Sequence, residues 1–100
     1  MKKERYVISY HENCDFTDNI GTQRFKAETD DLKLAIKIVK TIAKHVNLDS
    51  YLFSLLEQRI KKNLEGRGSY FFGDTNKKYN CRIEKIKISE TLHRIKKGEV

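Results

Sequence analysis

The stretch that decides the fold is TDDLKLAIKIVKTIAKHV, residues 29–46. Its apolar residues recur every three or four positions, the spacing that places side chains on one side of an α-helix. Thr29-Asp30-Asp31 supplies an N-cap with acidic groups beside it, so the helix is predicted to start there. Leu34 and Ile38 widen the apolar arc, and we therefore expect this helix to be covered on two sides. The apolar positions are Leu32, Ala35, Ile36, Val39, Ile42, Ala43 and Val46.

A second helix is predicted directly after the first. Asn47-Leu48-Asp49-Ser50 reads as a short turn that supplies a new N-cap, and Gly66 is expected to close the segment. The connection is so short that an antiparallel or steeply crossed helix pair is favoured. The apolar residues with helical spacing are Leu52, Leu55, Leu56, Ile60 and Leu64.

A strand hairpin is predicted before the helices. Residues 5–10 alternate between apolar and polar side chains, and residues 23–28 alternate around Phe25 and Ala27. An alternation of period two is typical of a half-buried strand. The residues between them, 11–21, form a long, acidic loop in this interpretation.

A second hairpin is predicted after the helices. Residues 69–72 and 79–83 are aromatic and β-branched, and turn-forming residues lie between them. The apolar pattern then shifts to Ile86 and Ile88, which predicts a β-bulge at Glu84-Lys85. Residues 89–100 are expected to form a short helix, frayed over about residues 90–100.

Together these elements predict an α+β fold. Two antiparallel β-hairpins form one sheet, in the order ββααββ, with two helices packed on one face. The length of 100 residues fits a single small basic domain that covers residues 1–100.

Charge is distributed unevenly along the chain. The net charge of the whole chain is +7, from 21 Lys and Arg and 14 Asp and Glu. Residues 1–31 carry a net −2, residues 32–65 a net +4 and residues 66–100 a net +5. The first hairpin is therefore acidic, and the helices and second hairpin are basic.

The lysines of the first helix form the leading candidate site. Lys33, Lys37, Lys40 and Lys44 advance by four, three and four residues, so they fall within a narrow arc opposite the apolar arc. Like charges this close repel, and a polyanion lying along them would relieve that repulsion. The alternative is structural. The only exposed strip of a buried helix must be polar, and lysine is the polar residue that an A/T-rich genome most readily supplies.

Further candidate contacts lie on the second helix and second hairpin. Three consecutive aromatics cannot all face one core, so Tyr70 or Phe71 is a candidate for stacking on a base or a partner side chain. The segment does not match the RNA-recognition motif in detail. The remaining candidates are basic: Arg59, Lys61, Lys62, Arg67, Lys77 and Lys78.

Catalysis, metals and cofactors find no support in the sequence. No nucleophile with a base, no paired carboxylates and no glycine-rich phosphate loop is present. One loop holds metal-capable groups, but a closed zinc site needs about four ligands, and the loop would have to recruit one from far along the chain. We expect no metal, no cofactor and no enzyme activity. The loop residues are His11, Glu12, Cys14, Asp15 and Asp18.

The predicted function is binding. The first hypothesis is a non-catalytic module that engages nucleic acid, or a nucleic-acid-bound protein complex, through the basic helix and hairpin. The alternative is a small inhibitor or regulator of phage or mobile-element origin, of the anti-CRISPR kind, that acts by protein–protein contact. No run of about 18 apolar residues is present, and Cys14 and Cys81 are expected to be reduced, so we expect a cytoplasmic protein with no membrane partner.

Overall fold

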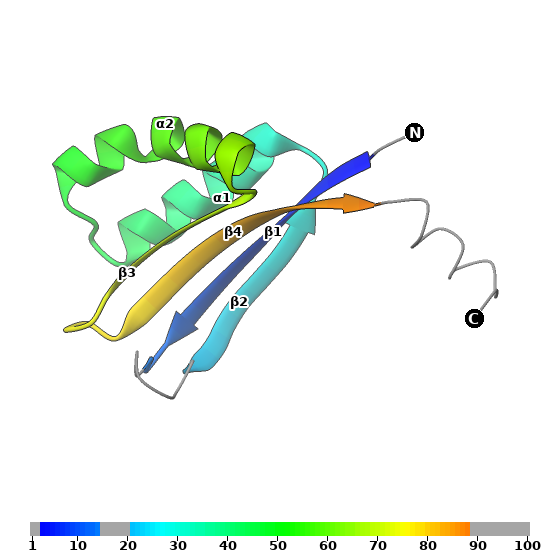
Figure 1. Cartoon of the computed structure of the whole chain (residues 1–100). Helices are drawn as coiled ribbons and strands as arrows, with labels where there is room; N and C mark the ends of the chain where they lie inside the picture. The colour runs from blue at the N-terminus through cyan, green and yellow to red at the C-terminus, as the bar shows by residue number, and fades with distance from the viewer. Residues whose placement is uncertain (1–2, 15–20, 89–100) are drawn as a thin grey trace.

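The computed structural model describes residues 3–14 and 21–88, which form one four-stranded sheet with both helices on one of its faces (Figure 1). The predicted α+β fold and the order ββααββ are confirmed. The elements are β1 (Lys3–Glu12), β2 (Thr22–Thr29), α1 (Leu32–His45), α2 (Ser50–Gly66), β3 (Ser69–Asp74) and β4 (Tyr79–Ile88).

The sheet is held together by the pairing of the first strand with the last. The strand order is β2-β1-β4-β3, and all three neighbouring pairs are antiparallel. The β1–β4 pairing runs from Lys3 opposite Ile88 to Glu12 opposite Tyr79 without a break. The two hairpins therefore share one sheet, with β2 and β3 at its edges.

Each helix begins where an aspartate caps it. The Asp31 carboxylate accepts hydrogen bonds from the backbone N–H groups of Lys33 (2.9 Å) and Leu34 (3.4 Å). Asp49 does the same for Tyr51 (3.0 Å) and Leu52 (3.4 Å). Such caps satisfy N–H groups that have no partner within the helix, and each stabilises it by about 1 kcal/mol.

The core lies between the helices and the two central strands. Val39 of α1 and Ile60 of α2 are almost completely buried, as are Ile8 of β1 and Ile83 of β4. The helices lie side by side over the sheet, α1 mainly over β1 and α2 mainly over β3. The inward-facing residues of the strands and helices thus form one continuous apolar cluster.

The prediction of a β-bulge at Glu84-Lys85, in β4, is wrong. Lys85 pairs with Tyr6 and Ile86 with Arg5, in unbroken register. β3 begins opposite Glu84, so the residues of β4 after that point extend past the neighbouring strand. The apolar pattern shifts there because Ile86 lies on the uncovered face, where it is 42% exposed. The register shift of the sheet lies instead in the β1–β2 pairing, between Tyr10 and His11.

Three other predictions need correction or lie outside the described residues. Leu34 was expected within the covered arc of α1, but it is 45% exposed because none of the described strands or helices packs over that side of α1. The predicted helix at 89–100 and most of the acidic loop, 15–20, fall outside the described ranges. Within those ranges, no helix has the length and apolar character required to cross a membrane.

Cys14 and Cys81 are buried and form no disulfide. Burial raises the pKa of the Cys81 thiol to about 12 and also raises the pKa of Cys14. The reactive thiolate is therefore scarce at neutral pH, and access to Cys81 requires the core to open.

Thiol labelling should report this burial. In a Cys14→Ser variant at pH 8, a thiol-specific reagent should modify Cys81 at least about a thousandfold more slowly in the native protein than in denaturant, because opening the core costs most of the folding free energy. Fast labelling of the native protein, with unchanged circular dichroism, would contradict the placement of Cys81 in the core.

Candidate nucleic-acid interface

The four lysines of α1 lie along one side of the helix. Lys33, Lys37 and Lys44 are exposed and Lys40 is partly exposed, while the buried residues of α1 point to the sheet and to α2. We call these four residues the basic strip. No carboxylate of the described chain forms an ion pair with Lys33, Lys37 or Lys44. These three ammonium groups are therefore open to an external anion.

Lys40 differs from the other three because it joins the two helices. Its Nζ donates to a carboxylate oxygen of Glu57 at 2.9 Å, and Lys61 approaches the other oxygen at 3.2 Å. The hydrogen bond from Lys40, with that from Lys61 next, lowers the pKa of Glu57 below its usual range. One carboxylate is thus shared by two cations, and the cluster keeps a net positive charge.

The tip of the second hairpin meets the C-terminal end of α1. The Lys77 ammonium donates to the backbone carbonyl of Val46 at 3.4 Å. A cation at this position complements the partial negative charge of the helix end. Lys78, the next residue, is exposed. Its backbone φ of 56° is part of the tight turn between β3 and β4. The Lys77–Val46 contact places the tip at the C-terminal end of α1. Lys44, in the last turn of the helix, has its Nζ 5.7 Å from the centre of the Phe53 ring.

Of the basic candidates on α2 and at its C-terminal end, Lys61 alone among the described residues lies next to the strip. Lys61 lies beside Lys40 through Glu57, but Arg59 and Lys62 are exposed on sides of α2 turned away from α1. Arg67 is exposed at the C-cap of α2. The positive charge of the second helix is therefore spread around it.

The two aromatic candidates point to opposite faces of the sheet. Tyr70 lies on the helix side, partly buried against the core and beside the Phe72 ring. Phe71 is 61% exposed on the face turned away from α1 and α2, opposite Arg82 of β4. The sheet separates Phe71 from the basic strip, so a flat partner cannot contact both at once.

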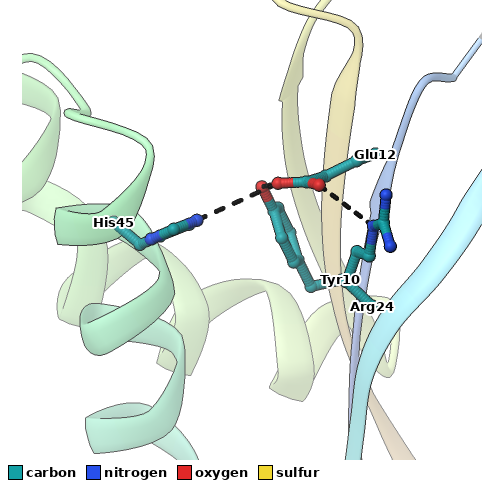
Figure 2. Close-up of polar contacts among 4 residues, drawn as sticks. All are labelled: Tyr10, Glu12, Arg24 and His45. Carbon is teal, nitrogen blue, oxygen red and sulfur yellow. Dashed lines mark hydrogen bonds and ion pairs between the residues drawn. The ribbon is translucent and has the colours of Figure 1, made fainter.

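Sequence reasoning missed a polar cluster at one end of the core (Figure 2). The Tyr10 hydroxyl donates to the Glu12 carboxylate at 2.6 Å, and the Arg24 Nε donates to its other oxygen at 3.1 Å. His45, in the last turn of α1, has its Nε2 3.9 Å from Glu12. The cluster joins β1, β2 and α1.

Glu12 is the centre of this cluster. The hydrogen bond from Tyr10 contributes most to lowering the pKa of Glu12, and the charges of Arg24 and His45 act in the same direction. Burial and the adjacent Glu12 raise the pKa of Tyr10. Tyr10 and Glu12 share a strand face, which sequence alternation indicates. The approach of His45 depends on how α1 packs on the sheet, and alternation along a strand does not indicate that packing.

The described members of the loop considered for metal binding do not converge. His11 and Glu12 alternate along β1 and point to opposite faces of the sheet, and Asp15 and Asp18 lie outside the described ranges. Residues 3–14 and 21–88 contain no group of three His, Cys, Asp or Glu side chains arranged to hold a metal ion.

Comparisons of the chain with protein-family models, with curated proteins and with solved structures each gave no match.

Replacing Tyr10 by Phe should raise the pKa of Glu12 towards its ordinary value, because the strongest stabilisation of the carboxylate is lost. Glu12 has a lowered pKa in the folded protein, so its contribution to stability is present above its unfolded pKa and disappears as pH falls through the folded value. The unfolding midpoint of the variant should therefore lie below that of the unaltered protein at pH 7, and the two should converge in acid. Carboxyl NMR titration and denaturant unfolding measure both effects.

Tyr79→Phe is the matched control for this prediction. Tyr79 is buried beside Tyr10, but its hydroxyl makes no hydrogen bond to a described residue. If both variants shifted the Glu12 titration equally, the Tyr10–Glu12 bond would not be the cause.

Proposed function

We propose that this protein is a non-catalytic binding module that engages nucleic acid, or a nucleic-acid-bound protein, through the basic strip and the adjoining hairpin tip. One observation carries the proposal. Lys33, Lys37 and Lys44 are exposed along one side of α1 without a carboxylate partner in the described chain, and the Lys77–Val46 contact places the hairpin tip at the C-terminal end of the same helix.

The dimensions of the strip suit a phosphate backbone. From Lys33 to Lys44 the helix rises by roughly 16 Å, at about 1.5 Å per residue. One strand of a duplex presents a phosphate about every 3.4 Å along the axis, so the strip spans roughly five phosphates. Each lysine that neutralises a phosphate releases a condensed counterion, which favours binding at low salt.

The chemistry of the strip favours sequence-independent binding. Base edges are read mainly by bidentate side chains such as Arg, Asn and Gln, whereas lysine acts on phosphate as a point charge. The strip contains lysine alone. We therefore expect similar affinity for different sequences of the same length. A cytoplasmic location, in which the protein would meet such a partner, is part of the same proposal.

Affinity for a generic duplex should fall steeply as salt rises. Lys33→Gln/Lys37→Gln should reduce the slope of log affinity against log salt by about 1.8, since each lost phosphate contact removes about 0.9. Fluorescence anisotropy with a labelled duplex over a range of salt concentrations measures this slope.

Arg5→Gln/Arg82→Gln is the charge-matched control. It also removes two positive charges, but from the sheet face turned away from α1 and α2, so net charge changes equally while the strip is intact. An equal loss of affinity in both variants would mean that binding follows net charge and not this surface. Absence of binding at low salt would reject nucleic acid as the partner and favour contact with a protein, as an inhibitor or regulator would make.

A further inference from the structure

β2 is the more exposed of the two edge strands of the sheet. β2 is an edge strand, so half of its backbone N–H and C=O groups point away from β1 and can pair with another strand. α1 lies mainly over β1 and leaves the helix side of β2 half covered. Phe25 is consequently 41% exposed there.

An apolar groove runs between α1 and β2. It has a volume of about 710 Å³ and is lined by Tyr10, Phe25, Ile38 and Ile42, with the Glu12 cluster at one end. Leu34 lies one helical turn before Ile38 on the same side of α1 and is 45% exposed. A bare edge and exposed apolar side chains therefore occupy the same flank of the molecule.

The opposite side of β2 carries two unpaired charges of opposite sign. Lys26 and Glu28 are exposed on the uncovered sheet face, where their β1 neighbours are the uncharged Ser9 and Val7. Neither forms an ion pair with a described residue. Charges on an edge strand usually discourage pairing with another strand. When a Lys and a Glu lie two residues apart, however, an antiparallel second copy of the strand can place each Lys opposite a Glu.

We propose that the partner of this edge is a second copy of the chain. Two β2 strands pair antiparallel around a two-fold axis through Ala27, which faces its own symmetry mate. Lys26 of each copy then lies opposite Glu28 of the other, and Phe25 lies opposite Thr29. Both helix layers stay on the same side of one continuous sheet, and the interface is self-complementary as two-fold symmetry requires.

The geometry of β2 selects this register. The shift between Tyr10 and His11 interrupts the ladder at Arg24, so the regular part of β2 is Phe25–Thr29, whose central residue is Ala27. An axis through Ala27 therefore pairs all five residues. An axis through Lys26 would place that lysine opposite itself.

The helix side of the proposed dimer accounts for the exposed apolar residues. With α1 over β1 in each copy, the two α1 axes would lie about three strand spacings apart, roughly 14 Å. Directly packed helices lie about 8–10 Å apart, so the gap has room for side chains from both copies. Phe25, Leu34 and Ile38 of each copy point into it and would be covered there.

A charge swap tests the register. Lys26→Glu and Glu28→Lys each place like charges opposite one another twice, and each should weaken the dimer about tenfold in sedimentation equilibrium. The double variant Lys26→Glu/Glu28→Lys restores both pairs and should return the dimer to near its original strength. Since both positions face uncharged neighbours within the chain, circular dichroism should show that all three variants fold.

Cross-linking tests the same axis independently. In Ala27→Cys the two introduced thiols would face each other at a Cα separation of about 4.5–5.5 Å, within the range of a disulfide, so mild oxidation should yield a covalent dimer. Phe25→Cys is the control. Its symmetry mate would lie four residues further along the strand, roughly 14 Å away, and should not cross-link.

Three results would overturn the proposal. They are a monomer at every protein concentration up to the millimolar range, failure of the double swap to restore a dimer weakened by the single changes, and equal cross-linking at positions 25 and 27. The measurements contain no nucleic acid, and Lys33→Gln/Lys37→Gln should leave the dimer unchanged. Failure of the dimer and failure of the proposed function are thus separable.

Discussion

The structure depends on burying the apolar side of α1 against the two central strands. Ala35 and Val39 have almost no exposed surface, and neither do Ile8 of β1 and Ile83 of β4, which pair with each other beneath the helix. The β1–β4 ladder joins segments more than 60 residues apart in sequence, from Lys3 opposite Ile88 to Glu12 opposite Tyr79. Closing such a long loop costs entropy, and the apolar burial it makes possible offsets that cost.

Burial of α1 also decides where the charge goes. Once one side of the helix faces the sheet and a flank faces α2, the lysines are left on the remaining side. Only Lys40 lies near enough to α2 to pair with Glu57, and that pair also holds Lys61. The basic strip is therefore continuous with the polar contact between the helices, whereas Phe71 lies on the opposite face of the sheet.

Two helices do not cover four strands evenly. α1 lies mainly over β1 and α2 mainly over β3, so the helix side of β2 is only half covered. Phe25 and Leu34 are exposed as a result, and the Glu12 cluster closes one end of the groove between them. The same placement thus produces a basic surface above the helices and an apolar flank at one sheet edge, two features suited to different partners.

The sequence by itself determined the local elements and the fold class, because caps and periodicity act over a few residues. Asp49 and Asp31 cap the helices within the predicted turns, and the strands lie where alternation placed them. It also determined that the α1 lysines share one side. Tertiary structure alone decided the unbroken register of β4, the exposure of Leu34, the face on which Phe71 lies, and the meeting of His45 with Glu12. Each of these follows from contacts between segments far apart in sequence, which no local pattern records.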